Sequence, residues 1–523
     1  MCKRKFWLSA FLAFGVVLAV SSHHLGQFSF WNDEADTAVL SGSILRTGLP
    51  SADDGQNVLI FEGCSQLGRR GLLSKKIPWV QYYVAAVSRL IFGEGEAGTR
   101  FLFVFLGCLS LFPLSLLLRR SWGSGAPVIS ALILLGPQTF LFMRNARYYP
   151  LLIAEYAFLL WGLFGESSSS RLKKGVLLGS LVLLFETHPV VAVGTAIAVW
   201  VFDRSARKAV VLSLGVWGVS YFAVGETPLE LAQGGGVQTA AASVWMAAWA
   251  TLRDLDRVSA LPTLGWVALG GIFAARRFRE RIFPAAREPA VLFVLATLVA
   301  QIAIDSTLIG TETAQGWSVL RYLPHLIVGL GFVLARVLGT LSEWRRGSAI
   351  LIGVFLMTGW GTLSYWTGGA RVWTEWVPIG AELRSPLQDP LRTLYTQVQA
   401  VLPTAVERIQ IEPSVLDANG IVYLGGRARV RPELSENSAC ADAVREKLGA
   451  ERFAALEKPA EARLVFGGAR QSGESVEKNG FREIRLKLGR GWLDGSRPEL
   501  TRHEFLQETG EIPVALWVKA SGP

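Results

Sequence analysis

Two adjacent carboxylates, Asp33 and Glu34, are the residues of this chain best suited to acid–base chemistry. They follow the apolar run 6–22 at a short distance. Carboxylates near a membrane surface are costly and are usually functional, and a carboxylate can accept a proton from an attacking group. Asn32 followed by two acids is also a good helix start, because acidic side chains are stabilised in the first turn of a helix. The two interpretations are compatible.

The composition predicts a polytopic α-helical membrane protein. The chain has 523 residues, of which 51% are hydrophobic and only 18% are charged, and it contains 18 Trp. A soluble protein of this size would carry more charge. The formal net charge of +10 could suggest nucleic-acid binding. The basic residues, however, fall in short clusters between apolar runs, as in cytoplasmic loops, so we do not expect a nucleic-acid partner.

Apolar runs of near-spanning length predict about eleven transmembrane helices. The stretch 174–202 is read as two short helices, because Thr187-His188-Pro189 interrupts it and proline disfavours helix continuation. The basic Lys3-Arg4-Lys5 before the first run would also suit a signal peptide, but the many later runs favour an uncleaved first helix. The predicted spans are 6–22, 99–118, 125–143, 148–165, 174–187, 189–202, 208–225, 261–275, 289–309, 320–339 and 348–366.

The run 77–92 is better read as a helix lying in the outer interface than as a further span. It has spanning length but carries Gln81 and Arg89. If it does not cross, every basic cluster between the later spans lies on the cytoplasmic side, as the positive-inside rule requires. Trp79 and Tyr82 then act as interfacial anchors. This topology places the N-terminus inside and the C-terminus outside.

The division predicted by composition is a transmembrane module at 1–366 and a small C-terminal α/β domain at 367–523, outside the membrane. Strand-like alternation at 407–411 and 514–518 flanks a helical stretch at 440–448. The cysteines Cys2, Cys64, Cys108 and Cys440 include no CxxC pair, so we expect no thiolate metal site. Cys108 is expected to be a core residue, whereas Cys64 and Cys440 could pair outside the membrane.

When the predicted spans are oriented in this way across the membrane, polar residues gather at their outer ends, and no comparable set lies in their inner halves. A transporter needs polar groups at the midplane and a route to both sides, whereas an enzyme acting on an outer-leaflet substrate needs them on one side. Arginines suit a lipid-linked phosphate donor. The set comprises Asp33, Glu34, Arg100, Arg144, Arg147, Tyr148, Tyr149, Glu155, Glu186, His188, Asp305, Glu312, Arg321 and Tyr322.

Four segments in this order resemble the GT-C glycosyltransferases, and most closely the protein O-mannosyltransferase and lipid A aminoarabinose transferase type. They are the Asp-Glu pair, an amphipathic helix in the first outer loop (about 23–98) followed by FGEGEAGTR at 92–100, RNARYYPLL at 144–152 and RYLPHL at 321–326. The resemblance covers about residues 1–340. The C-terminal part carries no motif of this family.

The resemblance implies an inverting transfer of a sugar from a polyprenyl-phosphate donor to a glycolipid, polysaccharide or protein, at the periplasmic face of the inner membrane. By position, Asp33 matches the acidic catalytic residue, which would act as the base, Glu34 its neighbour and Arg100 the arginine near the donor. Positive charge at the departing phosphate is expected from Arg100, Arg147 or Arg321. Some relatives have a second acidic residue near position 147, where this chain has arginine, so no divalent metal is expected to be required.

The residues given these functional roles also have structural interpretations. The arginines could be residues that reach to the headgroups, His188 a polar helix-end residue and Glu155 a packing residue; Tyr148 and Tyr322 are further cavity candidates. Two other function classes stay open. A flippase of lipid-linked sugar predicts polar residues accessible from the cytoplasm, and a non-catalytic assembly subunit predicts that Asp33 and Arg100 are freely replaceable.

Overall fold

The computed structural model describes twelve stretches of the chain. They are 2–59, 72–74, 79–166, 170–224, 287–308, 323–339, 390–412, 417–425, 428–431, 438–466, 481–489 and 511–519. The predicted spans 261–275 and 348–366 lie outside them, as does the start of the span at 320–339.

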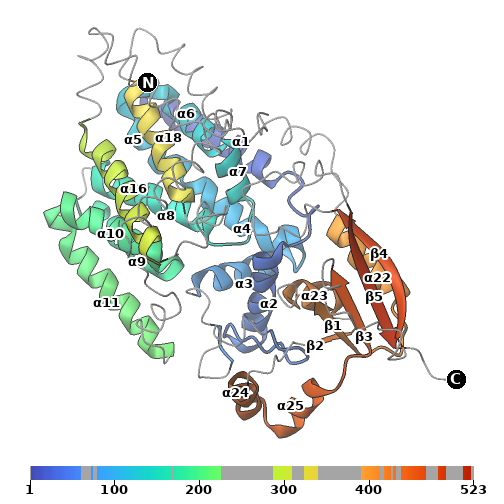
Figure 1. Cartoon of the computed structure of the whole chain (residues 1–523). Helices are drawn as coiled ribbons and strands as arrows, with labels where there is room; N and C mark the ends of the chain where they lie inside the picture. The colour runs from blue at the N-terminus through green and yellow to red at the C-terminus, as the bar shows by residue number, and fades with distance from the viewer. Residues whose placement is uncertain are drawn as a thin grey trace.

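A bundle of helices makes up the larger part of the molecule (Figure 1). The predicted break at Thr187-His188-Pro189 is confirmed, since one helix ends at Thr187 and the next begins at Pro189. The bundle helices are α1 (Cys2–Ser22), α4 (Glu96–Leu109), α5 (Leu111–Trp122), α6 (Ala126–Leu134), α7 (Pro137–Met143), α8 (Tyr149–Phe164), α9 (Ser170–Thr187), α10 (Pro189–Phe202), α11 (Arg207–Val224), α16 (Pro289–Leu308) and α18 (Pro324–Leu338), with short 3₁₀ turns at Gly123–Gly125 and Arg204–Ala206.

Two of the predicted spans are each divided into two helices by proline. The run 99–118 is split at Ser110, because Pro113 has no N–H to continue the ladder of α4 and is tolerated only in the first turn of α5. The run 125–143 is split at Gly136, where Pro137 begins α7. Length and apolarity alone fail to locate these breaks, because both halves of each run remain hydrophobic.

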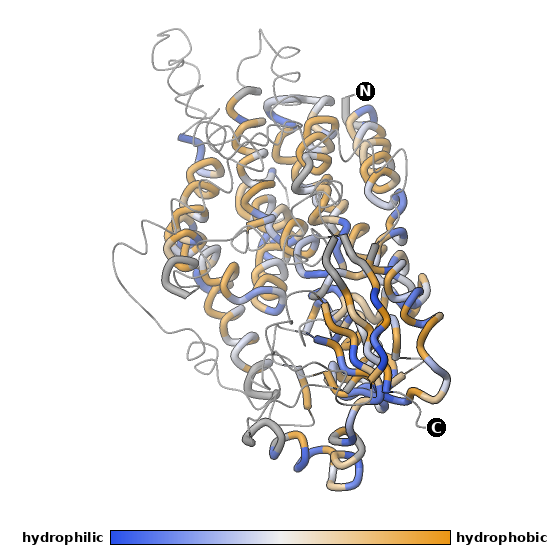
Figure 2. Tube along the Cα trace, turned by 45° about the vertical axis from the view of Figure 1, so that its right-hand side comes forward, coloured by the Kyte–Doolittle hydropathy of each residue, from blue (hydrophilic) through white to orange (hydrophobic). Residues whose placement is uncertain are grey.

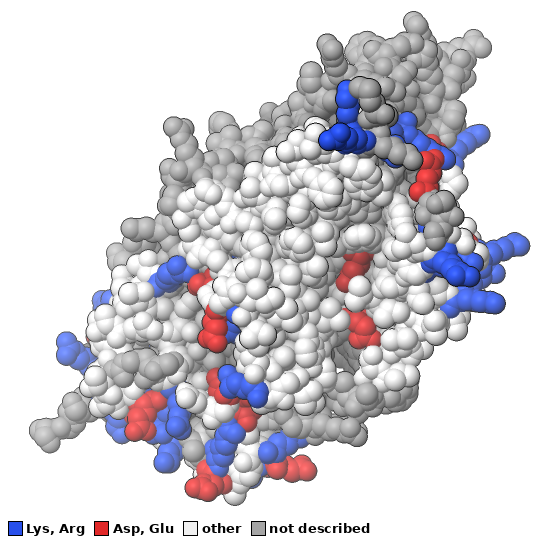
Figure 3. Space-filling model, turned by 180° about the vertical axis from the view of Figure 1, so that it is seen from behind, with Lys and Arg blue, Asp and Glu red and all other residues white. Residues whose placement is uncertain are grey.

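The bundle exposes many large apolar side chains. Arg4–Ser22 and Glu96–Leu134 are, within the described part, the two helical segments long and apolar enough to cross a bilayer, and shorter apolar helices accompany them. Figure 2 shows the bundle helices as predominantly hydrophobic. In Figure 3, Lys and Arg side chains gather toward opposite corners of the visible face, with a wide and mostly uncharged band between them.

A five-stranded mixed sheet forms the C-terminal unit. Its strand order is β2-β1-β3-β5-β4, with β1 parallel to β2 and β3, and β5 antiparallel to β3 and β4. The strand stretches predicted at 407–411 and 514–518 lie in β1 and β5, and the predicted helix lies in α24. The elements are α22 (Pro390–Val401), β1 (Arg408–Glu412), α23 (Asp417–Leu424), β2 (Arg429–Arg431), α24 (Ser438–Leu448), α25 (Ala450–Glu457), β3 (Ala462–Phe466), β4 (Phe481–Gly489) and β5 (Glu511–Lys519).

Two helices of the first loop, α2 (Asn32–Thr47) and α3 (Val80–Phe92), lie between the bundle and the sheet (Figure 1). Leu40 of α2 and Tyr82 of α3 are buried in the same hydrophobic cluster as Ile409 of β1 and Leu516 of β5. The sheet therefore shares a core with the first loop. On its other side α3 exposes apolar residues, among them Leu90 at 73%, as an interfacial helix would; its depth in a membrane remains a prediction.

Gly98 permits the close approach of α3 and α4. A Cβ built at this residue would clash with the carbonyl oxygen of Gly93 and would lie 2.7 Å from that of Phe92. We expect Gly98→Ala to destabilise the protein by about 1–3 kcal/mol, because backbone atoms cannot move aside as a side chain can. Thermal unfolding in detergent would measure this. Gly175→Ala in α9 is the control, since nothing lies within 4 Å of its added Cβ, and equal effects of the two substitutions would contradict the prediction.

Candidate active site

The helix α2 begins with the Asp-Glu pair, and Trp31 is its N-cap. The Trp31 backbone is extended, and its N–H donates to Glu34 Oε2 at 3.4 Å. Asp33 and Glu34 occupy the first turn, where the helix dipole stabilises negative charge. The helix-start interpretation of these acids is therefore confirmed. It does not exclude chemistry, because the two carboxylates have different surroundings.

Glu34 forms a fully buried ion pair with Arg100 of α4. Its Oε1 accepts from Arg100 Nε at 2.9 Å and its Oε2 from Arg100 Nη2 at 2.6 Å. The Ala146 N–H donates to Glu34 Oε1 at 2.7 Å. The side chain of Glu34 is 0% exposed. With its carboxylate bound on both oxygens and covered, Glu34 has a structural role here.

Arg100 has no donor left for a substrate. A guanidinium has five N–H groups, and in Arg100 the three that do not bind Glu34 donate to the carbonyl oxygens of Leu25, Phe28 and Ser29 at 2.8–3.0 Å. Its side chain is 2% exposed. Binding of the donor phosphate by Arg100 stays a prediction, and in this geometry it would require Arg100 to give up one of these contacts. Here the arginine fixes the chain between α1 and α2 and neutralises Glu34.

Asp33 pairs with a different arginine, Arg147, which lies between α7 and α8. Arg147 Nη2 donates to Asp33 Oδ2 at 3.0 Å, and its Nη1 donates to the Asp33 carbonyl oxygen at 3.2 Å. The Asp33 side chain is 11% exposed and that of Arg147 is 3% exposed. Burial acts to lower the pKa of Arg147, but the Asp33 carboxylate, together with the nearby Tyr149, Tyr148 and Tyr82, outweighs it, and the pKa is raised. Asp33 is thus the acid of the pair that retains access to solvent.

The segment 144–148 docks along the start of α2 through three successive contacts. Asn145 Oδ1 accepts from the Trp31 indole N–H at 3.0 Å. Ala146 and Arg147 follow with the contacts to Glu34 and Asp33 given above. This explains why the motifs around residues 31–34 and 144–149 occur together. Sequence reasoning did not select Asn145, nor Asp36, which is buried one turn after Asp33 on the same side of α2.

Three other predicted cavity residues lie deeper in the bundle. The ring centroids of Tyr148 and His188 are 4.7 Å apart, and His188 caps α10, its Nδ1 accepting from the Val191 N–H at 3.4 Å. Glu155 accepts from Thr187 Oγ1 at 2.7 Å. The structure therefore joins Glu155 and His188 to the same helix junction. Tyr148 connects this junction to the Asp33–Arg147 pair, since Arg147 Cζ lies 5.4 Å from the Tyr148 ring centroid. Arg321, Tyr322 and Cys64 lie outside the described residues, and Cys108 is buried as predicted.

The residues around Asp33 do not fit a divalent cation. The Arg147 guanidinium lies beside the Asp33 carboxylate, and both carboxylate oxygens of Glu34 bind Arg100. Among the described residues, no group of three or more His, Cys, Asp or Glu side chains could hold a metal ion. A guanidinium is an electrostatic substitute for such a cation, so we derive no step through a metal.

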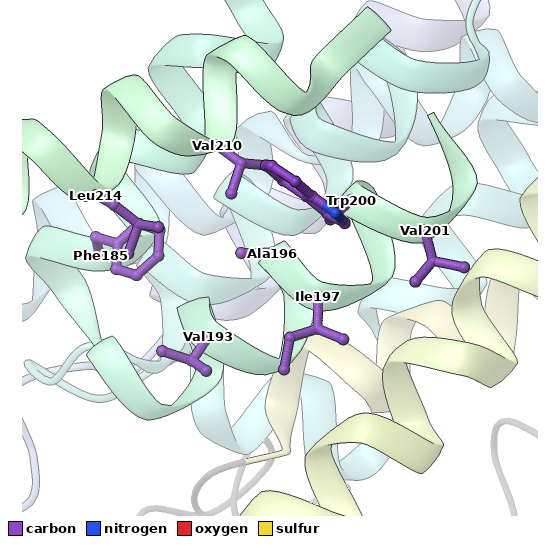
Figure 4. Close-up of a pocket in the computed structure, with 8 residues that line it drawn as sticks. All are labelled: Phe185, Val193, Ala196, Ile197, Trp200, Val201, Val210 and Leu214. Atoms are coloured by element: carbon purple, nitrogen blue, oxygen red, sulfur yellow. The ribbon is translucent and has the colours of Figure 1, made fainter. Parts of the chain in front are cut away.

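A cavity of about 300 Å³ lies on the side of the bundle between α9, α10 and α11. Figure 4 shows its apolar lining, which includes Trp200 and Ile197 of α10 and Leu214 of α11. These three side chains are 40–48% exposed. An apolar hollow on the outside of a membrane bundle suits hydrocarbon chains. It offers no group for proton transfer, so we do not place the chemistry there.

Comparison with known proteins identifies the fold. No protein-family model and no curated protein sequence matches the chain. The structure is similar to that of ArnT from Cupriavidus metallidurans, solved in the apo state (TM-score 0.55, 14% identity, 97% of each chain covered) and bound to undecaprenyl phosphate (TM-score 0.54, 14% identity, 99% of this chain and 98% of that chain). The archaeal oligosaccharyltransferase AglB from Archaeoglobus fulgidus matches at a TM-score of 0.41 with 11% identity, over 88% of this chain and 70% of that chain, too low a score to support an argument. The similarity to ArnT over almost the whole of both chains shows that this protein is a helical membrane protein with the GT-C fold.

Proposed function

We propose that this chain is an inverting glycosyltransferase of the membrane, which moves a sugar from a polyprenyl-phosphate donor to an acceptor at the outer face. The observation that carries the proposal is the difference between the two neighbouring acids. Glu34 is buried and committed to Arg100, whereas Asp33 is held beside Arg147 with part of its side chain exposed. A general base must be accessible to the acceptor group whose proton it takes. Of the two acids, Asp33 is the one with an exposed part of its side chain.

The proposed reaction begins when Asp33 accepts the proton of an acceptor hydroxyl or amine. The acceptor atom forms a bond to the anomeric carbon, and the bond between that carbon and the phosphate oxygen breaks. The phosphate departs with the electron pair and is already ionised, so no second carboxylic acid has to protonate it, in contrast to glycoside hydrolysis. Positive charge near the departing phosphate stabilises the transition state. Arg147 supplies that charge in this proposal, and Arg321 remains a second candidate.

The choice of donor has independent support. The ArnT structure with the same fold binds undecaprenyl phosphate, which is the lipid released when an undecaprenyl-phosphate sugar gives up its sugar. The placement of the site at the periplasmic face, with the N-terminus in the cytoplasm, rests on the distribution of basic clusters. The acceptor in this proposal is a glycolipid, polysaccharide or protein of the cell envelope.

Mass spectrometry of envelope glycolipids and glycoproteins tests the proposal. Cells that make the chain are expected to contain a glycosylated product that is lost when the gene is deleted and restored by the wild-type chain. A flippase would instead change which leaflet the lipid-linked sugar occupies and would transfer no sugar itself, so the purified chain in vesicles with donor and acceptor would form no product. Single-cysteine labelling from both faces separates the two further, since a flippase requires polar positions accessible from the cytoplasm as well.

Among the described residues, Arg147 is expected to be the arginine whose substitution lowers the rate of sugar transfer most. Arg147→Met should lower the rate of transfer by about 10²- to 10³-fold, because it removes both the charge and the group that orients Asp33. Arg147→Lys should retain part of the rate, since it keeps a point charge but loses the paired contacts. Initial rates in vesicles of extracted envelope lipids would measure both. Arg120→Met is the control, because Arg120 is 67% exposed and pairs with the exposed Glu166; equal losses at both positions would contradict the assignment.

A further inference from the structure

The C-terminal unit reaches the site through Phe30, the residue before the N-cap of α2. The Phe30 N–H donates to the hydroxyl of Tyr423 at 2.6 Å, and the Phe30 carbonyl oxygen accepts from Asn419 Nδ2 at 2.8 Å. Tyr423 and Asn419 both belong to α23. Phe30 is 2% exposed, so its backbone groups depend on partners within the protein, and α23 provides both of the partners named above. Buried backbone groups need partners, which makes α23 the element that holds this residue.

Tyr423 also contacts Glu96, which lies on the same helix as Arg100 of the buried ion pair. Its hydroxyl donates to Glu96 Oε1 at 3.1 Å, and Arg392 of α22 donates to the same oxygen at 2.6 Å. Glu96 lies one turn before Arg100 on α4, and Arg100 holds Glu34. Burial, and next the Glu96 carboxylate, raises the pKa of Tyr423. The hydroxyl therefore stays protonated at physiological pH and can donate to Glu96 while it accepts from Phe30.

These contacts hold the start of α2 from two sides. On one side α23 holds Phe30, and on the other Asn145, Ala146 and Arg147 hold Trp31, Glu34 and Asp33. The segment between α1 and α2 consists of turns and extended residues, so it has no helical ladder of its own to fix its position. The alignment of Asp33 with Arg147 depends on the contacts from both sides. A shift of Phe30 would move the start of α2 that follows it.

We propose that Tyr423 is a positioning residue for the reaction: through Phe30 and Glu96 it fixes the first turn of α2 and so the place of Asp33. This inference rests on the proposed function. It assigns the C-terminal unit a part in the site itself, although the unit carries no recognisable family motif. A misplacement of about 1 Å at a reacting group can lower a rate by about 10²-fold, so the loss of one such contact is expected to be measurable.

The stacked pair Tyr423 and Tyr395 provides a matched control. Their ring centroids are 5.2 Å apart and their planes differ by 25°. The Tyr395 hydroxyl is buried with no hydrogen-bond partner in the described part of the chain. Tyr423→Phe and Tyr395→Phe thus remove the same atom from the same stack, and only the first removes the contacts to Phe30 and Glu96.

The experiment uses the full-length wild-type chain and both variants in vesicles of extracted envelope lipids. Hydrogen–deuterium exchange of the peptide covering residues 28–36 is expected to be about tenfold faster in Tyr423→Phe and unchanged in Tyr395→Phe, as the loss of one buried hydrogen bond predicts. The initial rate of transfer should fall about 10- to 100-fold in Tyr423→Phe alone. The Kd for undecaprenyl phosphate should stay within about twofold of wild type, which separates misplacement of Asp33 from loss of the lipid site or of the fold.

Several outcomes would overturn the inference. Unchanged exchange at residues 28–36 in Tyr423→Phe would show that the hydroxyl holds nothing, and faster exchange with an unchanged rate would show that the hold does not serve the reaction. Equal effects of the two variants would assign the effect to the stack. If wild type itself transferred no sugar, the proposed function would fail, and the exchange measurement alone would then decide whether Tyr423 fixes α2.

Discussion

Asp33→Asn is expected to lower the rate of sugar transfer by about 10²–10⁴-fold while the protein still inserts and folds. The amide has the same shape as the carboxylate, and its oxygen can still accept from Arg147 Nη2, which binds Asp33 Oδ2 at 3.0 Å. What the amide cannot do is take a proton from the acceptor. The substitution therefore isolates the chemical role of Asp33 from its role at the helix start. Initial rates in vesicles of envelope lipids measure the effect.

The matched control for this substitution is Asp442→Asn. Asp442 lies on α24, its side chain is 67% exposed, and it pairs with the nearby Arg445, so its loss should leave the rate at the wild-type value. The Kd for undecaprenyl phosphate should be close to wild type in both variants. The melting temperature should fall in Asp33→Asn alone, because Arg147, 3% exposed, loses its counter-ion, so rates are compared per amount of folded protein. Transfer by Asp33→Asn within about threefold of wild type would remove Asp33 as the base and direct attention to Asp36, one turn away.

Glu34→Gln is expected to have the largest effect on stability. It leaves the Arg100 charge, 2% exposed and bound by the carbonyl oxygens of Leu25, Phe28 and Ser29, without its counter-ion. Removing one partner of a buried ion pair costs about 3–5 kcal/mol, because the remaining charge is neither solvated nor paired. We expect a strong fall in the apparent melting temperature in detergent, or loss of folded protein. Fluorescence-detected gel filtration after a temperature series would measure it.

A second variant keeps this prediction testable if Glu34→Gln does not fold. The double substitution Glu34→Gln and Arg100→Met removes both charges and should recover much of the stability, since a buried pair can often be replaced by apolar groups. It should bind undecaprenyl phosphate with the wild-type Kd if Arg100 is structural. A large loss of lipid affinity in a stable double variant would indicate that Arg100 binds the phosphate of the lipid, and its purely structural role would be wrong.

Glu166→Gln is the control for these stability measurements. It breaks the pair between Glu166 and Arg120, whose side chains are 65% and 67% exposed. Exposed ion pairs contribute little because solvent screens them, so the melting temperature should not change. If Glu34→Gln melted with wild type as well, the buried pair would be no more important than this exposed one, and the structural role assigned to Glu34 would be wrong.

The sequence by itself determined what depends on local composition and spacing. Long apolar runs with little charge indicated a helical membrane protein, Asn32-Asp33-Glu34 indicated a helix start, and Pro189 located the break between α9 and α10. Alternation located β1 and β5. These features follow from properties of neighbouring residues along the chain, so no tertiary contact is needed to predict them. Even here the breaks inside 99–118 and 125–143 were missed, because the hydropathy signal is insensitive to a single proline.

Only the tertiary structure decided which groups can do chemistry. Asp33 and Glu34 are identical in kind and adjacent in sequence, but successive residues of a helix point in different directions, and their partners come from distant segments. Arg100 is 66 positions from Glu34, and Arg147 is 114 positions from Asp33. Tyr423 reaches Phe30 across 393 positions. Burial and pairing are properties of these long-range contacts. The sequence therefore could not show that Glu34 is fully buried against Arg100 while Asp33, paired with Arg147, stays partly exposed as the candidate base.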